Sequence, residues 1–348
     1  MEITSIFIDR IINEAIRRGA TNIHLSAGSV PALRINGSLE YIEKESAMTA
    51  DLLDKAVKFF LDEKAEEELK KQREFSLVKS FNNSARFRVN IFFQKNLPSL
   101  SLSYIPSVVP HLADLGLPRE FFDTTLKRHG LLIVAGPNDS GKSSTSSSVL
   151  EEINHTQKKY IVTLENPIEY NLINRQSVIE QRQVGRDIEN FKTGLENCLS
   201  EDVDVVYLSD LRGELSSALP LIFDLAAGNA LVIMEMRAEN TVQALEKIIN
   251  AAGDKNSREA FRYALADILL GVLSQRLLPK RGGGMALAAE VFWANPAARS
   301  LIREGKILQL DGIIQTSKSE GMISLEKSLE KLVSAGVISQ EEAEKFNS

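Results

Sequence analysis

The chain has little of what builds disulfides, redox centres or thiolate metal sites. Among 348 residues there are four histidines and one cysteine, Cys198, which excludes an intrachain disulfide and cysteine-rich metal sites. No apolar stretch reaches the roughly 18 residues of a membrane span, and the charges of Glu2, Asp9 and Arg10 are not typical of a secretory leader. With 41 Lys and Arg against 47 Asp and Glu, the net charge is −6, so no basic excess indicates a nucleic-acid partner. We therefore expect a cytoplasmic protein.

The first third of the chain predicts a small α+β domain. Asn36-Gly37 is the preferred pair for a tight hairpin turn, and polar and apolar residues alternate over 85–93, which is typical of a half-buried strand. We place this domain at residues 1–105 and a proline-punctuated linker at 106–128. The expected helices are 8–16, ended by Gly19, and 50–71, and the expected strands are 23–25, 32–35, 39–42 and 85–93.

The remainder, residues 129–348, predicts an α/β domain. Short apolar runs that alternate with helical stretches indicate a parallel sheet covered on both faces. Beyond about residue 255 the pattern is mostly helical, except for a hairpin across Gly282–Gly284, and the helical C-terminal segment begins at about 295. Ser339 with Glu342 three residues later predicts the start of the last helix. The expected strands are Leu131–Ala135, Ile161–Leu164, Val203–Leu208 and Leu231–Met234.

The strongest local motif directly follows the first of these apolar runs. Residues Gly136 to Ser143 fit the phosphate-binding pattern G-x-x-x-x-G-K-[ST]. The backbone N–H groups of such a loop converge on phosphate oxygens, Lys142 brings a cation to the β and γ oxygens, and the Ser143 hydroxyl is a ligand for Mg²⁺. Asp139 puts a carboxylate into the loop, which opposes a triphosphate unless it points outward. The predicted nucleotide-binding residues are Gly136, Pro137, Asn138, Asp139, Ser140, Gly141, Lys142, Ser143 and Ser144.

With that loop in place, ordered motifs along nearly the whole chain resemble the PilT-like pilus retraction ATPases of the secretion-ATPase superfamily. Ile23–Gly28 is similar to the family's D-L-H-L-S-A-G, Arg86–Asn90 to R-F-R-V-N, and Leu164–Glu169 to the Asp box, I-E-D-P-I-E. Ala297–Glu304 resembles A-I-R-N-L-I-R-E, a signature of the retraction branch, and Ile314–Thr316 also fits.

The resemblance implies a PAS-like N-terminal domain followed by a RecA-like P-loop ATPase core with a helical C-terminal part. It also implies ATP and Mg²⁺ as ligands, a ring hexamer with nucleotide at the subunit boundaries, and a place at the inner membrane beside the platform protein of a type IV pilus. Arg86 and Arg88 would lie at an interface. The retraction-like motif residues would couple nucleotide state to motion: Arg299, Leu301, Ile302, Arg303 and Glu304.

Several catalytic positions depart from the family pattern. Where the family has G-E-M-R-D, with its Glu assigned to water activation, this chain has Ser209–Gly213, so Asp210 offers a carboxylate that is one methylene shorter. Misplacing a catalytic group by ~1 Å can cost ~100-fold in rate. In the Asp box, Asn166 replaces an aspartate while Glu165 and Glu169 remain. Glu165 and Asp210 are therefore the candidate catalytic residues of a degraded site.

The cationic groups are altered as well. The family's T-G-H-L-V-F-x-T-L-H aligns with residues 228–237, where Ala230 and Arg237 replace the two histidines; Arg237 can still offer a positive donor to a γ-phosphate, without titrating near neutral pH. Asn96 and Ser103 replace two arginines that the family gives across the subunit boundary. Such arginines are worth ~10³–10⁵ in rate in P-loop enzymes.

These departures lead to one hypothesis and leave alternatives open. The chain would bind ATP·Mg²⁺ but hydrolyse it slowly or not at all, as an accessory or regulatory component of a homo-hexamer or of a mixed ring with an active PilT-like ATPase. One alternative is a working hexameric retraction motor with a divergent site, in which Asp210 or Glu165 orients water. Others are a scaffold that binds no nucleotide and a RecA-like nucleic-acid translocase, which the acidic balance disfavours.

Overall fold

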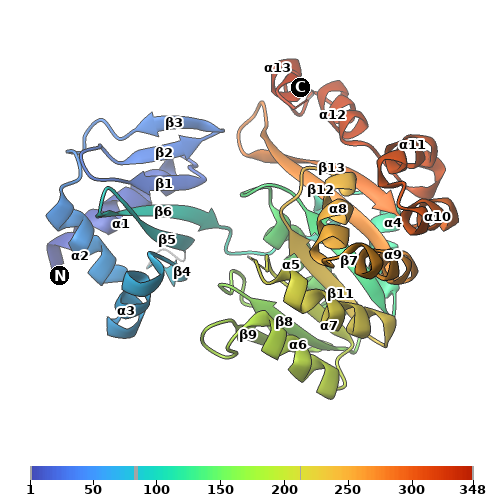
Figure 1. Ribbon diagram of the computed structural model, residues 1–348. Coiled ribbons are helices and arrows are strands. Elements are labelled where there is room, and N and C mark those ends of the chain that lie inside the picture. The colour runs from blue at the N-terminus through green and yellow to red at the C-terminus, as the bar shows by residue number, and fades with distance from the viewer. Residues whose placement is uncertain (1, 82–84, 212, 347–348) are drawn as a thin grey trace. The chain divides into compact units, whose positions relative to one another are not determined.

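The computed structural model describes residues 2–81, 85–211 and 213–346, which form two compact units (Figure 1). The first unit comprises Met1–Val108 with Gly282–Met285, and the second comprises Val109–Arg281 with Ala286–Ser348. Arg212, in the stretch aligned with the family's acidic strand end, lies outside the described residues. Within the described ranges, we find no helix with the length and apolar character to cross a membrane.

The described strands of the first unit form a six-stranded antiparallel sheet in the order β3-β2-β1-β6-β5-β4. Apolar residues from the sheet and from all three helices form its core, including Ile12, Leu53, Leu69 and Val89. The helices are α1 (Glu2–Arg17), α2 (Ala50–Phe60) and α3 (Glu63–Gln72), and the strands are β1 (Asn22–Leu25), β2 (Ala32–Ile35), β3 (Ser38–Tyr41), β4 (Glu74–Ser80), β5 (Arg86–Gln94) and β6 (Leu97–Ile105).

Residues with positive φ form two of the hairpin turns in this unit. Asn36 and Gly37, with φ of 49° and 81°, make the predicted two-residue hairpin between β2 and β3. Sequence analysis missed β4 and β6, because serines and a proline give β6 a weak strand signal. Strand β6 is nevertheless central, paired with β5 on one side and β1 on the other. Lys95 and Asn96, with φ of 49° and 62°, form the β5–β6 turn.

The second unit confirms the predicted α/β sheet. Its seven described strands lie in the order β13-β12-β7-β11-β10-β8-β9, and neighbouring strands from β12 to β9 are parallel. Side chains of β7 alternate between the faces, so that Leu131 and Ile133 join one apolar cluster while Leu132 and Val134 join another. The strands are β7 (Gly130–Ala135), β8 (Tyr160–Glu165), β9 (Val178–Gln183), β10 (Val205–Leu208), β11 (Leu231–Met236), β12 (Leu269–Pro279) and β13 (Met285–Trp293).

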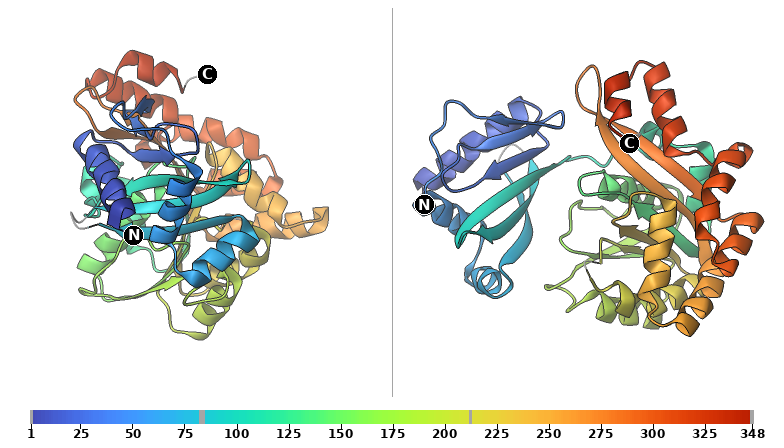
Figure 2. Two further views of the ribbon diagram at one scale, coloured as in Figure 1. Left: turned by 90° about the vertical axis from the view of Figure 1, so that its left-hand side faces the viewer. Right: turned by 45° about the horizontal axis from the view of Figure 1, so that its top comes forward.

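Helices cover both faces of this sheet (Figures 1 and 2). Helix α5 contributes Val149 and Ile153 to one apolar cluster, while α7 and α8 contribute Ile222 and Ile248 to the other. The predicted hairpin is β12–β13, and Ser339 caps the last helix by accepting from the Glu342 N–H. The helices are α4 (Arg119–Phe122), α5 (Lys142–Thr156), α6 (Phe191–Ser200), α7 (Leu215–Ala227), α8 (Thr241–Ala251), α9 (Lys255–Ile268), α10 (Pro296–Glu304), α11 (Leu310–Thr316), α12 (Leu325–Ser334) and α13 (Gln340–Glu344).

Two features of this unit differ from the sequence expectation. Strand β9 was missed, because its residues after Ile179 are polar. The segment 106–128, expected as a linker, belongs to the second unit from Val109 onward. Leu112 and Phe121 explain this difference, since they are 2% and 0% exposed within the apolar cluster on one face of the sheet. The proline-containing segment before β7 is therefore packed against the second unit and is not a free linker.

Candidate nucleotide-binding site

The phosphate-type loop lies where the fold favours ligands. Strand β7 ends at Ala135, and α5 begins at Lys142, so residues 136–141 join the carboxyl end of a parallel strand to the N-terminus of a helix. Ligands of open α/β sheets bind at these strand ends. The free N–H groups and the positive end of the helix dipole at such a terminus favour phosphate.

The two motif glycines are required by the local geometry. A Cβ at Gly136 would stand 2.3 Å from the Ser140 Oγ and 2.7 Å from the Gln275 carbonyl oxygen, so only glycine lets β7 pass β12 this closely at the loop. Gly141 has φ of 86°, a left-handed conformation that suits glycine. Asp139 is exposed and has φ of 57°, which an aspartate tolerates at some cost.

The polar groups of the loop fit a phosphate ligand. Lys142 is 8% exposed, and its Nζ donates to the carbonyl oxygens of Gly136 at 3.1 Å and Pro137 at 2.6 Å. The ammonium therefore sits inside the curl of the loop. Ser140 is 3% exposed, and its Oγ has no hydrogen-bond partner among the described residues. A buried hydroxyl without a partner and a buried ammonium in one loop are groups that an anionic oxygen ligand would satisfy.

The Mg²⁺-type hydroxyl of Ser143 contacts a buried carboxylate that sequence analysis did not single out. Ser143 Oγ donates to Glu235 Oε2 at 3.3 Å, and the Tyr207 hydroxyl donates to Glu235 Oε1 at 2.7 Å. Glu235 is 3% exposed, and burial raises its pKa to about 7 although Lys142 and Tyr207 act in the opposite direction. The signal for it was present in the sequence, because a charged residue inside an apolar parallel strand is rare.

Glu165, the first candidate catalytic residue, is the last residue of β8 and is 5% exposed. Its Oε1 accepts hydrogen bonds from the Thr163 Oγ1 at 2.7 Å and the Gln181 Nε2 at 3.0 Å. Burial raises the pKa of Glu165 to about 7, because desolvation outweighs these two hydrogen bonds. The structure therefore holds this carboxyl between β8 and β9, where it is largely protonated below neutral pH.

Asp210, the second candidate, forms an ion pair with Arg237. The Arg237 Nε donates to the Asp210 Oδ2 at 2.5 Å. The two residues follow β10 and β11, which are neighbouring parallel strands in which Leu208 is opposite Met234. Their carboxyl ends therefore bring together a candidate base and a candidate phosphate-sensing cation.

The expected interface arginines lie on the first unit's sheet. Arg86 and Arg88 are half-buried on β5, opposite Ser80 and Val78 of β4. The Arg86 Nε is buried without a hydrogen-bond partner among the described residues. Ser103, at a position where the family has an arginine, accepts from the Asn22 side chain at 2.8 Å and so supports the sheet. The role of Arg86 and Arg88 between subunits stays a prediction.

The retraction-like motif forms α10 and fastens it to α9. Arg299 donates to the carbonyl oxygens of Ala266 and, at 2.9 Å, of Asp267 near the end of α9, and at 2.9 Å to that of Leu269, the first residue of β12. Arg303 adds a 2.6 Å hydrogen bond to the Asp267 carboxylate. Ile302 is fully buried and Leu301 packs against the same apolar cluster, whereas Glu304 remains exposed and pairs with Lys306 at 2.7 Å.

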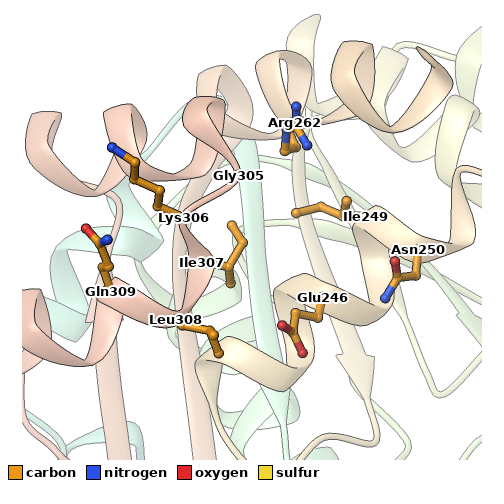
Figure 3. A pocket seen from close by; sticks show the side chains of 9 residues that line it. All are labelled: Glu246, Ile249, Asn250, Arg262, Gly305, Lys306, Ile307, Leu308 and Gln309. Atoms are coloured by element: carbon orange, nitrogen blue, oxygen red, sulfur yellow. The ribbon is translucent and has the colours of Figure 1, made fainter. Parts of the chain in front are cut away.

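A separate pocket of 350 Å³ opens beside this motif, and no loop residue lines it. Helices α8 and α9 form one side, and the turn after α10 forms the other (Figure 3). Its charged groups have both signs, which favours no single ligand class. The lining residues are Glu246, Ile249, Asn250, Arg262, Gly305, Lys306, Ile307, Leu308 and Gln309.

Comparison with known proteins identifies the family. The family model described as "Type II/IV secretion system protein" matches residues 1–331. The chain belongs to this family. It is 32% identical over 344 residues to the type IV pilus retraction ATPase PilT of Pseudomonas aeruginosa, covering 97% of this chain and 96% of that protein. It is also 32% identical to a twitching motility protein of Neisseria gonorrhoeae, covering 90% and 83% of the two chains.

A solved structure shows the same likeness in three dimensions. The crystal structure of the pilus retraction motor PilT with bound ADP superposes with a TM-score of 0.78 at 33% identity, covering 97% of this chain and 95% of that one. These matches confirm the predicted fold class, an α/β chain with an N-terminal antiparallel-sheet domain and an ATPase core. The protein is thus a PilT-like member of the type II/IV secretion ATPase family.

Proposed function

We propose that this protein binds ATP with Mg²⁺ through residues 136–144 and hydrolyses it slowly or not at all. The loop supports the binding part, since it combines a helix N-terminus, a buried ammonium and an orphan hydroxyl. Mg²⁺ would shield phosphate charge in the bound complex and is held through Ser143 in loops of this type. The ADP bound to the related PilT is consistent with this ligand class.

The observation that carries the slow-hydrolysis part is the Asp210–Arg237 ion pair. A general base must present an available carboxylate to water, and here the only acidic side chain after β10 in residues 209–211 and 213 accepts from a guanidinium at 2.5 Å. Arg237 in turn would have to leave Asp210 before it could contact a phosphate through the same Nε. Asn166 and the replacement of the family's histidines at positions 230 and 237 remove further members of a set whose contributions to the rate are not additive.

In a ring, a subunit that binds nucleotide without cleaving it still contributes to motion. Binding shifts a conformational equilibrium without chemistry, provided that the nucleotide prefers one state. We therefore propose an accessory or regulatory role in a hexamer, either of this chain alone or mixed with an active PilT-like ATPase. The ring would lie on the cytoplasmic side of the inner membrane, against the platform protein of a type IV pilus. Its role would be in pilus retraction and twitching motility.

Two measurements on the purified full chain test this function. The first is calorimetric titration with ATPγS and Mg²⁺, and the second is steady-state phosphate release from ATP, each with Lys142→Ala prepared identically to report contaminating ATPases. Saturable binding with release far below ~1 s⁻¹, the low end of ordinary enzyme turnover, supports the proposal. Release above that rate that is lost in Lys142→Ala would instead establish an active retraction motor. Absence of saturable binding would establish a scaffold.

Mixing tests the accessory role. Combining the chain with an active PilT-like ATPase from the same source should give mixed rings by native mass spectrometry and a changed phosphate release per active subunit. The Lys142→Ala variant, with its fold verified by circular dichroism, is the matched control, because it should not bind the nucleotide. If mixed rings form with wild type and with Lys142→Ala but phosphate release per active subunit changes with neither, regulation through nucleotide binding is ruled out.

A further inference from the structure

We propose that Glu235 is the carboxylate through which this chain holds the Mg²⁺ of its bound nucleotide. The inference rests on the proposed nucleotide binding and adds a residue to that site. In the family motif T-G-H-L-V-F-x-T-L-H, the position aligned with Glu235 is a threonine. The chain therefore places a charge where the motif has a neutral side chain.

The contacts of Glu235 point it at the metal-binding hydroxyl. Strand β11 lies beside β7, and Glu235 is opposite Val134, two residues before the loop begins. Tyr207 on β10 engages Oε1 at 2.7 Å, which leaves Oε2 directed at the Ser143 Oγ, 3.3 Å away. A serine hydroxyl beside a carboxylate is the set of hard oxygen ligands that Mg²⁺ prefers.

Two of the other acidic groups that the family motifs place here have partners of their own. Asp210 is paired with Arg237. Glu165 Oε1 accepts from Thr163 and Gln181, and Asn166 carries no charge. Of these positions and 235, Glu235 alone combines a carboxylate with a hydrogen bond to Ser143. The carboxylate that contacts the metal-binding hydroxyl thus comes from β11.

Burial gives a second, independent argument. Glu235 is 3% exposed, and a carboxylate so far from water is costly unless a cation or a full set of donors compensates it. Two hydroxyl donors supply one hydrogen bond to each oxygen, and the Lys142 ammonium adds a favourable charge from the loop. A divalent cation is the compensation that a phosphate-binding site itself brings, together with its nucleotide.

The experiment compares wild type with Glu235→Gln, using ATPγS affinity in Mg²⁺ and in EDTA. We expect the Mg²⁺-dependent gain in affinity to fall by about tenfold or more, the effect of removing a group that supports a metal ligand. The affinity in EDTA should stay the same or rise, since a negative charge near the phosphates is removed. Electron paramagnetic resonance of Mn²⁺ with ADP should show correspondingly weaker metal binding, independently of turnover.

The controls separate this inference from its premise. Glu290→Gln is the matched variant, because Glu290 is also a buried glutamate. Its carboxylate accepts a hydrogen bond from the Thr241 backbone N–H at 2.8 Å. This variant should leave the Mg²⁺ dependence of ATPγS affinity unchanged. If Glu235→Gln does not fold, Glu235→Thr restores the residue of the family motif and is tested instead. An unchanged Mg²⁺ gain, or equal losses in Mg²⁺ and EDTA, overturns the role of Glu235. Wild type that binds ATPγS in neither condition overturns the proposed function itself.

Discussion

Arg237 donates a 2.5 Å hydrogen bond to Asp210, joining the ends of two neighbouring parallel strands. The guanidinium is about half exposed, with 52% of its side-chain surface accessible, and the carboxylate less so at 26%. The pair therefore lies at the edge of the strand ends, where water and nucleotide would arrive. The pair joins a candidate base to a cation, and this relationship can be changed by mutation.

Releasing Asp210 should raise hydrolysis. Arg237→His restores the residue of the family motif and removes the permanent guanidinium, so phosphate release should increase by about tenfold, a modest share of the ~10²–10⁴ that a general base supplies. Arg237→His combined with Asp210→Glu should exceed either single variant. Arg10→Gln, which breaks an ion pair with Glu45 in the first unit, is the control and should have no effect. Unchanged release in the double variant would place the defect elsewhere.

Removing the loop cation should abolish nucleotide binding. Lys142→Ala is expected to weaken ATPγS binding by at least ~100-fold, since deleting one partner of a buried charged contact costs about 2–5 kcal/mol. The Nζ contacts to Gly136 and Pro137 fix the loop conformation too. Calorimetric titration measures the loss, and circular dichroism verifies the fold. Retention of wild-type affinity in a folded variant would refute the assignment of this loop to phosphate.

Neutralising Asp139 should tighten nucleotide binding. Asp139 is exposed, and its backbone is in the left-handed region with φ of 57°. Asparagine also adopts this conformation. Asp139→Asn therefore removes the charge with little change in backbone preference. We expect about a threefold to tenfold gain in ATPγS affinity from reduced repulsion. Asp224→Asn, at an exposed position on α7, should change nothing. An equal affinity in the two variants would show that Asp139 acts on no phosphate.

The buried Glu165 should make stability depend on pH. Its pKa rises from 4.5 in the unfolded chain to about 7 in the folded one, so between these values only the folded state binds the proton. The free energy of unfolding should therefore be greatest below pH 4.5 for this group and fall by about 3 kcal/mol as pH rises through 7. The side-chain amide oxygen introduced by Glu165→Gln can still accept both hydrogen bonds. The variant should lose the Glu165 share of this fall and keep that of Glu235, whose pKa is raised in the same way, as measured by urea unfolding without nucleotide. Parallel plots of unfolding free energy against pH for wild type and Glu165→Gln would contradict the role given to Glu165.

The clamp between α10 and α9 should stabilise the core unit. Arg299→Ala removes hydrogen bonds to backbone carbonyls where α9 ends and β12 begins. It should lower the free energy of unfolding by about 1.5–3 kcal/mol, as for bonds to charged groups. Arg303→Ala breaks a more exposed pair with Asp267, with 39% and 65% side-chain accessibility, and should cost below about 1 kcal/mol. Urea unfolding of both variants measures the order. Equal losses would mean that Arg299 does not act as a cap.

Local pattern was enough for the parts of the fold that depend on neighbours in sequence. The loop after β7, the Asn36-Gly37 hairpin and the Ser339 cap were all predicted, because turn chemistry and capping act within a few residues. Strands β4, β6 and β9 were not, since their residues are polar or serine-rich and only pairing with adjacent strands makes them extended. The burial of Leu112 and Phe121 likewise depends on the sheet that they cover.

The sequence by itself determined the family, the α/β sheet and the identity of the phosphate-type loop, since each is encoded in contiguous residues or ordered motifs. Only the tertiary structure decided that Asp210 meets Arg237 and that Glu235 meets Ser143. These pairs lie 27 and 92 positions apart, and their meeting follows from the order and register of β7, β11 and β10. Side chains at strand ends converge according to which strands are neighbours, and hydrophobic patterning does not specify that choice.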